Sequence, residues 1–360
     1  MELYETAFKN SVGVYQDGTL PFYRDVDGSL WTMAGHSHMG NICMFKGTRV
    51  DDMKMLYPIV TQFCVGHEDY AFNGIRYPEG IKSRGSVWPF GLYICPKTHR
   101  FFCFFHNETG WNGKGTGYDS LGFCDTPYFD TDFRHIGLMH SDDEGKNWYF
   151  DRWVITSEAP CISNKFSPEK TLGLGQNTKP LDTGSGDFTM FVQDGFIYLL
   201  YNKIHTDSDE LYWEGCHTYI ARTRIREDGF MGDFVKYYDG QFQEAGNMGK
   251  ETPISLNTWH SRVIYCQEDG YYYMAYNPVK PHVKHFVLAD YMVIQRSKNL
   301  LDWSNAEEVN AFDEKLGGHY FTLIPKNAVN NPFVSESKEF SILVSGQALD
   351  VKGVDIDLRK

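Results

Sequence analysis

The stretch WNGKGTGYDSLGFCDTPYFDTDFRHIGLMHSDDEGKNW, residues 111–148, carries two kinds of signal. Its second half predicts a strand that begins at Arg134, then a tight turn at Asp143 and Gly145, with Trp148 packed beneath the turn. Its first half reads as a polar, glycine-rich loop that contains Tyr118. A structural turn beside a loop with a possible base and a cation is the strongest functional hint in this chain.

Three segments of the chain resemble one another. Each has an apolar strand, a tight polar turn and a second strand that is rich in aromatics and ends in Asn. They are GLYICPKTHRFFCFFHN (91–107), FTMFVQDGFIYLLYN (188–202) and SRVIYCQEDGYYYMAYN (261–277). Residues 27–35 give a degenerate copy, and residues 319–324 with 340–346 supply a last hairpin. Antiparallel repeats of roughly 40–50 residues are typical of a β-propeller.

The length of 360 residues, divided by that period, gives five to seven blades. We expect one all-β catalytic domain over residues 1–360, a propeller of seven blades, with five or six as alternatives. The aromatic content of 16% and the 34 glycines suit many short, turn-rich strands.

The composition restricts the partners. A net charge of −13 argues against nucleic acid and, more mildly, against a polyanionic substrate, which would need a local cluster of cations. The sequence has no run of about 18 apolar residues, so it predicts no membrane span. The opening residues show no signal peptide, which predicts a cytoplasmic protein as numbered, or a secreted or periplasmic one if the sequence has been trimmed. The eight cysteines include no C-x-x-C pair, so we expect reduced, buried thiols.

The repeat register predicts a ligand-binding face. Residues that follow each repeated strand share one end of the propeller, where such folds bind ligands near the axis. The polar residues at these positions are His36, His38, Asn107, Lys203, His205, Asn277 and Lys280.

One set of residues in this region suits β-elimination next to a uronic acid. Arg134 would neutralise the carboxylate, which makes the neighbouring C–H more acidic. Tyr118 or a neutral histidine, His38 or His67, would then abstract the proton, and Tyr118 could return one to the leaving oxygen. Each residue alone has a plainer interpretation, since histidines are often satisfied polar residues and Arg134 could pair with a nearby aspartate.

Two family resemblances rest on these residues. The pattern Ser141, Asp143, Gly145 and Trp148 resembles the Asp-box of sialidase-type propellers, a structural motif. The chain also resembles the seven-bladed propeller polysaccharide lyases that act on ulvan and on rhamnose–glucuronic acid linkages. Their sites use two histidines, then a tyrosine, then an arginine about sixteen residues later, as Tyr118 and Arg134 are spaced. The resemblance implies His67 as the second histidine and His36 or His38 as the first, although the gap from His38 to His67 is longer than in the family pattern.

The same resemblance implies a structural zinc ion bound by His and Cys. Candidate ligands are His205, Cys216 and His217, with Cys266, His282 and His285 further on. The alternative is a core cysteine with surface histidines. Catalysis itself would need no cofactor.

A glycoside hydrolase is the second hypothesis. Such propellers need two carboxyl groups, for which Asp187 and Glu251 are candidates and Glu158 a third, or a histidine-based site. The alternative is that Asp187 is a turn residue and Glu251 a solvated loop carboxylate. A non-catalytic carbohydrate-binding propeller is the third hypothesis.

Aromatic side chains near the expected face could stack on sugar rings. The candidates are Trp88, Trp111, Trp213 and Trp259. We expect His36, Asn107, Lys203, Trp259, His260 and Arg262 to contact substrate. The favoured partner is an anionic poly- or oligosaccharide, and the favoured activity is the lyase.

Overall fold

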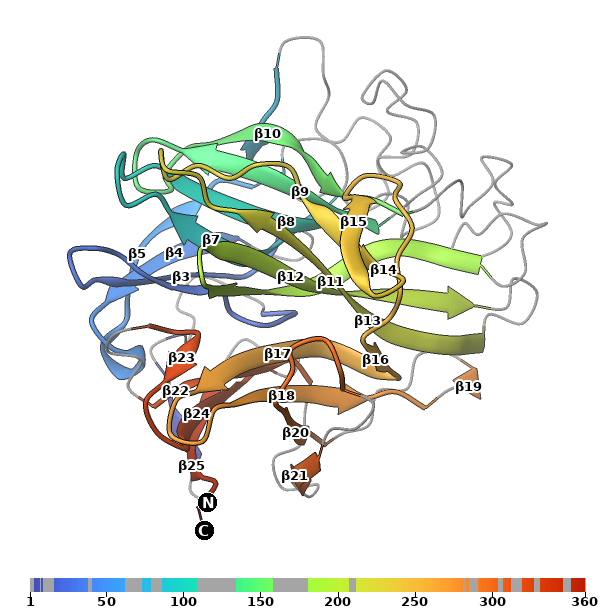
Figure 1. Cartoon of the computed structure of the whole chain (residues 1–360). Coiled ribbons are helices and arrows are strands. Elements are labelled where there is room, and N and C mark those ends of the chain that lie inside the picture. Colours follow the sequence, from blue (N-terminus) through green and yellow to red (C-terminus); the bar gives the residue numbers. More distant parts are fainter. Residues whose placement is uncertain are drawn as a thin grey trace.

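Antiparallel strands rich in aromatic and β-branched residues form five sheets (Figure 1). The structure, a computed structural model, describes residues 3–6, 8, 16–37, 41–61, 73–78, 86–108, 134–157, 181–206, 212–280, 283–284, 291–303, 307–311, 319–326, 331–345 and 351–359. Within these ranges, no helix is long and apolar enough to span a membrane.

Each sheet is one blade, and its strands follow in order from the inside outward. Blade 1 has β2 (Phe22–Arg24), β3 (Leu30–Ala34), β4 (Ile42–Gly47) and β5 (Lys54–Ile59), with the short helix η1 (Val50–Asp52) before β5. Blade 2 has β7 (Ser86–Ile94), β8 (Phe101–Glu108), β9 (Arg134–Ser141), β10 (Trp148–Ile155) and β6 (Ile75–Arg76). Blade 3 has β11 (Leu181–Gln193), β12 (Phe196–Thr206), β13 (Tyr212–Arg224), β14 (Val235–Tyr238) and β15 (Gln241–Ala245), with β16 (Ser255–Leu256) and β19 (Val283–Lys284) on β13.

The last two blades complete the ring. Blade 4 has β17 (Thr258–Cys266), β18 (Tyr271–Pro278), β20 (Val293–Ser297) and β21 (Glu307–Ala311), with β23 (Val334–Ser335) beside β17. Blade 5 has β22 (Phe321–Pro325), β24 (Glu339–Val344), β25 (Lys352–Asp357) and the N-terminal strand β1 (Leu3–Glu5). Because β1 pairs antiparallel with β25, the two ends of the chain meet in one blade (Figure 1).

The ring closes with these five blades. The inner strands contact one another in the order β2, β7, β11, β17 and β22. Blade 5 then returns to blade 1, where the Leu20 N–H donates to Thr322 Oγ1 at 2.8 Å. The prediction of seven blades is therefore wrong, and five blades, kept as an alternative, is confirmed.

Long connections between blades explain the wrong number. The inner strands begin at residues 22, 86, 181, 258 and 321, so every interval exceeds the predicted period of roughly 40–50 residues. The repeated hairpins themselves are right: they correspond to β7–β8, β11–β12 and β17–β18.

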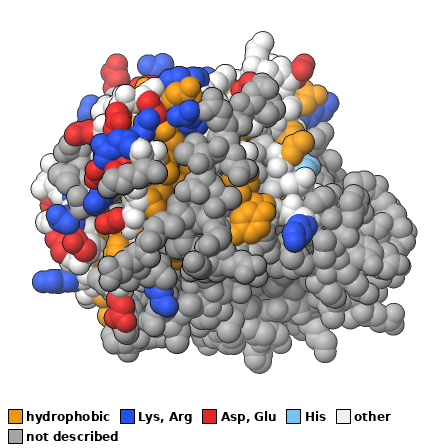
Figure 2. All heavy atoms as spheres, turned by 90° about the horizontal axis from the view of Figure 1, so that it is seen from below, with side chains coloured by type: hydrophobic (Ala, Val, Ile, Leu, Met, Phe, Trp, Pro, Cys, Tyr) orange, Lys and Arg blue, Asp and Glu red, His pale blue; other side chains and the backbone are white. Residues whose placement is uncertain are grey.

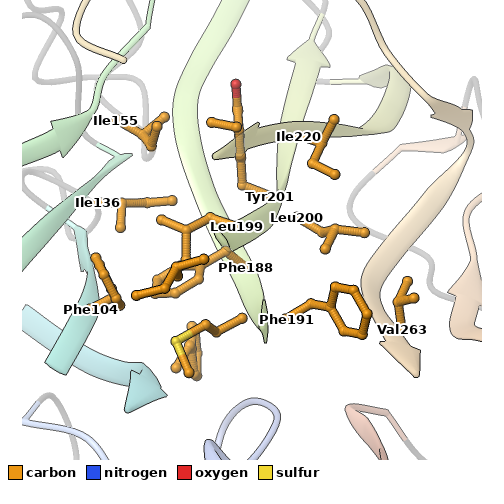
Figure 3. Packing of buried hydrophobic residues seen from close by; sticks show 14 of the residues in the cluster. Phe104, Ile136, Ile155, Phe188, Phe191, Leu199, Leu200, Tyr201, Ile220 and Val263 are labelled. Atoms are coloured by element: carbon orange, nitrogen blue, oxygen red, sulfur yellow. The ribbon is translucent and has the colours of Figure 1, made fainter. Parts of the chain in front are cut away.

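The hydrophobic core lies between neighbouring blades. Phe104, Ile136, Phe188 and Leu199 pack between blades 2 and 3, and Phe191 meets Val263 between blades 3 and 4 (Figure 3). Further clusters fill the interfaces of blades 1 and 2, 4 and 5, and 5 and 1. Fully burying one such side chain contributes about 1.5–3 kcal/mol, so the interfaces hold the ring together.

The turn between β9 and β10 is closed by its own polar side chains. Ser141 Oγ accepts the Gly145 N–H at 2.9 Å, and Asp143 Oδ1 accepts the Asn147 N–H at 2.9 Å. Gly145 has a φ of 83°, which suits glycine, and Trp148 is buried beneath the turn. These contacts stabilise the blade.

Charges of both signs are mixed on the face seen from below. The described Lys and Arg side chains there lie among Asp and Glu side chains (Figure 2). The cysteines in the described part of the chain are buried free thiols: Cys43, Cys95, Cys103, Cys216 and Cys266.

Candidate functional site

Three residues with a positive φ lie on, or just before, inner strands near the propeller axis. Asp187 on β11 has a φ of 47°, His260 on β17 has 50°, and Tyr320 just before β22 has 61°. In β11 and β17 the pairing register shifts around this residue. Such conformations are uncommon for residues other than glycine and are often found at functional sites.

The preceding blade holds the backbone N–H of each of these residues. His106 Nδ1 accepts the Asp187 N–H at 2.8 Å. Asn202 Oδ1 accepts the His260 N–H at 2.8 Å, and Asn277 Oδ1 accepts the Tyr320 N–H at 3.2 Å. Residues in the second half of β8, β12 and β18 therefore hold the backbone of the next blade.

Side chains from three blades meet at Asp187. Arg134 Nη1 donates to Asp187 Oδ2 at 3.2 Å, and His260 Nε2 lies 3.3 Å from Asp187 Oδ1. The side chains of Arg134 and Asp187 are 5% and 12% exposed, and that of His260 is 1% exposed. The rings of Phe90 and Tyr320 pack edge-on against His260, with centroids at 5.0 and 4.8 Å.

The surroundings keep Asp187 ionised. Burial alone would raise the pKa of this carboxyl, but the positive charge of Arg134 and the hydrogen bond from His260 outweigh burial. They hold the pKa of Asp187 well below its usual range. A buried carboxylate with this chemistry at the end of a propeller axis is a candidate functional group.

A row of rings links this cluster to blade 1. His36 stacks on Trp88 with ring centroids 5.1 Å apart, and Trp88 meets His106 edge-on at 5.3 Å. Trp88 Nε1 donates to Asp17 Oδ2 at 3.3 Å. Asp17 is thus a second carboxylate near the same group of side chains.

The sequence prediction missed His106 and Asp17. His106 directly precedes Asn107, and a shift of one residue along a strand exchanges the side chains of its two faces. Gly186 was a possible signal, because a Cβ there would lie 2.3 Å from His106 Nδ1. Asp17 precedes the inner strand of the degenerate first copy, where the repeat is weakest.

The other predicted substrate contacts lie in different surroundings. Asn107 Nδ2 donates to Ser86 O within blade 2 at 2.9 Å. Trp259 is buried in a cluster with Ile204 and Cys216. Arg262 is buried between inner strands and donates to the carbonyls of Met190 and Leu323.

Lys203 belongs to a second buried charge cluster. Its Nζ lies 2.6 Å from Glu251 Oε1, and Lys236 Nζ lies 3.1 Å from Glu251 Oε2. Tyr201 also donates a hydrogen bond to Glu251. Glu251 is therefore a buried, paired carboxylate rather than a solvated one.

Some of the predicted catalytic residues lie outside the described residues. These are His38, His67, Tyr118 and Glu158. Of the predicted lyase set, the structure describes Arg134, which lies beside Asp187, and His36, which stacks on Trp88.

The predicted metal ligands are described in part. Cys216 Sγ lies 3.6 Å from Thr258 O, and burial raises the pKa of this thiol well above its usual value. His217 Nδ1 accepts the Asn257 N–H at 3.2 Å, while the His205 side chain lies outside the described part. Among the side chains that the structure describes, no three His, Cys, Asp or Glu residues form a group that could hold a metal ion.

Solved structures with the same architecture include carbohydrate-cleaving enzymes. A family 117 glycoside hydrolase from Zobellia galactanivorans is 11% identical, with a TM-score of 0.52 over 99% of this chain and 90% of that chain. The fold is shared with glycoside hydrolases.

Two further structures extend the comparison. An exo-β-1,3-galactanase from Phanerochaete chrysosporium is 8% identical, with a TM-score of 0.50 over 99% of this chain and 65% of that chain. A thermostable family-43 glycoside hydrolase is 12% identical, with a TM-score of 0.47 over 96% of this chain and 91% of that chain. At these identities the likeness concerns the fold. No protein-family model matches the sequence, and no curated protein matches it.

Proposed function

We propose that this protein is a glycoside hydrolase with a site centred on Asp187 and His260. The observation that carries the proposal is the contact of a carboxylate, an imidazole and a guanidinium from three blades at the propeller axis. The hydrolase folds found in the comparison support it, since propellers of this architecture include enzymes that cleave sugars.

Hydrolysis of a glycosidic bond requires one group that protonates the leaving oxygen and another that activates water. His260 is suited to the first role, because Asp187 orients its Nε2, while its Nδ1 is buried and has no partner among the described residues. The ionised Asp187 stabilises positive charge on the imidazole and on the sugar ring.

We assign Asp17 to the attacking water. The water oxygen bonds to the anomeric carbon as the bond from that carbon to the leaving oxygen breaks. His260 gives its proton to the leaving oxygen, and Asp17 accepts the proton that the water loses. Arg134 acts through Asp187, by keeping it ionised, and His106 holds the backbone N–H of Asp187.

The position of Arg134 favours this mechanism over β-elimination. A lyase needs the guanidinium to bind the carboxylate of the substrate. Arg134 instead forms an ion pair with a carboxylate of the protein, and both side chains are buried. We keep an anionic glycan among the candidate substrates of the hydrolase.

The test is digestion of a panel of neutral and uronate-containing glycans. Both new reducing ends and near-ultraviolet absorbance are followed, because only elimination yields an unsaturated uronate. We expect reducing ends without absorbance, and a loss of about 10²–10⁴-fold in kcat for Asp187→Asn and His260→Gln.

Matched controls come from two exposed turns. Asp194→Asn changes an aspartate with a φ of 51° on the β11–β12 turn, and His99→Gln changes a histidine with a φ of 57° that pairs with Asp25 at 2.7 Å. Both should retain activity. Unsaturated product that persists in Asp187→Asn would support the lyase, and tight binding without turnover would support a binding propeller.

A further inference from the structure

Arg262 places a positive charge between the inner strands of three blades. It lies on β17 of blade 4, directly after the bulge at His260. Its Nη1 donates to Met190 O on β11 at 3.0 Å, and its Nε donates to Leu323 O on β22 at 3.2 Å. Since β11 and β22 flank β17 on opposite sides, the guanidinium lies toward the centre of the ring.

Among the residues that the structure describes, this guanidinium has no carboxylate partner. Arg262 is 1% exposed, its Nη2 has no hydrogen-bond acceptor among the described residues, and the ring of Phe333 lies 5.3 Å from Cζ. Burial lowers the pKa of Arg262 to about 10, so the group stays protonated at neutral pH.

The other buried cations in the described part have carboxylate partners. Arg134 pairs with Asp187, and both Lys203 and Lys236 pair with Glu251. A buried charge without such compensation destabilises the fold. Carbonyl oxygens of two strands satisfy part of the guanidinium but do not neutralise it.

We propose that Nη2 of Arg262 binds a small monovalent inorganic anion, with chloride as the occupant in physiological salt. A halide accepts hydrogen bonds from a guanidinium and supplies the missing negative charge. Strands from three blades surround the group, which favours a monatomic ion over an organic anion. This site is independent of the proposed hydrolase activity.

Two measurements on the whole protein test the site. Crystals soaked in sodium bromide should show an anomalous peak within hydrogen-bond distance of Nη2. In solution, Tm should rise by about 2–4 °C between low and physiological chloride, relative to sodium gluconate at equal ionic strength, because an anion that binds only the folded state stabilises it.

The variant Arg262→Met should abolish the difference between chloride and gluconate. Arg222→Met is the matched control, because Arg222 stacks between Phe196 and Phe242 at 4.5 and 4.1 Å and should leave the chloride effect intact. If Arg262→Met does not fold, the bromide soak and the chloride dependence of Tm of the wild-type protein decide whether the anion site exists.

Three results would overturn the proposal. One is the absence of a bromide peak at Nη2. Another is a peak without any chloride dependence of Tm, which would mean binding at crystal concentration only. The third is a chloride effect that persists in folded Arg262→Met.

Discussion

At the scale of single residues, Glu251 determines whether two buried lysines can coexist. Burial alone would raise the pKa of Glu251, but Lys203 and Lys236 lower it from 4.5 to about 2. The folded pKa is thus below the unfolded one, so ionisation of Glu251 stabilises the fold above about pH 4.5. That contribution, about 3 kcal/mol, is lost as pH falls from about 4.5 toward 2.

We expect Glu251→Gln to lower the free energy of unfolding by about 3–5 kcal/mol at neutral pH, because it leaves two ammonium groups without their shared carboxylate. The variant should also lose the part of the acid sensitivity that Glu251 causes. Urea denaturation between pH 3 and 7 measures both effects. The exposed control Glu227→Gln should change stability by less than about 0.5 kcal/mol. A Glu251→Gln protein as stable as the wild type would contradict the buried ion cluster.

At the scale of elements, the end of one blade positions the reactive residue of the next. Asn202 on β12 accepts the His260 N–H at 2.8 Å and donates to Thr258 O at 2.7 Å. We expect Asn202→Ala to cost about 1–3 kcal/mol of stability, because buried backbone groups lose their partner. It should also lower kcat at least tenfold, as His260 leaves its place beside Asp187.

Steady-state kinetics with a cleaved glycan, together with urea denaturation, measure both effects of Asn202→Ala. Asn299→Ala is the control, since Asn299 Oδ1 accepts the Leu301 N–H at 2.9 Å in an exposed turn of blade 4. It should leave kcat unchanged. If Asn202→Ala loses stability but keeps full kcat, this contact supports the fold without positioning His260.

At the scale of the whole molecule, pairing of β1 with β25 closes the ring. A Cβ at Gly353 on β25 would lie 2.3 Å from Cζ of Tyr4 on β1. We expect Gly353→Val to displace β1 and to lower the free energy of unfolding by about 1–3 kcal/mol, with a matching fall in Tm. At low temperature the activity should remain, because Arg134, Asp187 and His260 lie in blades 2, 3 and 4. The exposed neighbour Lys352→Val is the control, and an unchanged Tm in Gly353→Val would show that this seam contributes little.

The repeated hairpins could be predicted because alternating apolar residues and tight turns are local signals. The number of blades could not, because the connections between hairpins carry no period. Asp187 and His260 were both candidates, but for different hypotheses, one as a hydrolase carboxylate and one as a substrate contact. Their contact depends on two bulges and on Asn202 and His106 from other blades, and such long-range pairing leaves no pattern in neighbouring residues.

The backbone contacts of Asp187, His260 and Tyr320 also bear on how this protein could change its chemistry. The blade before it holds each of these residues through the backbone N–H, so the side chain takes no part in that contact. A carboxylate, an imidazole and a phenol already stand at these three positions, whose backbone N–H groups are held in the same way. A single substitution at Tyr320 could therefore place a new reactive side chain there, while Asn277 still holds the backbone N–H of that residue.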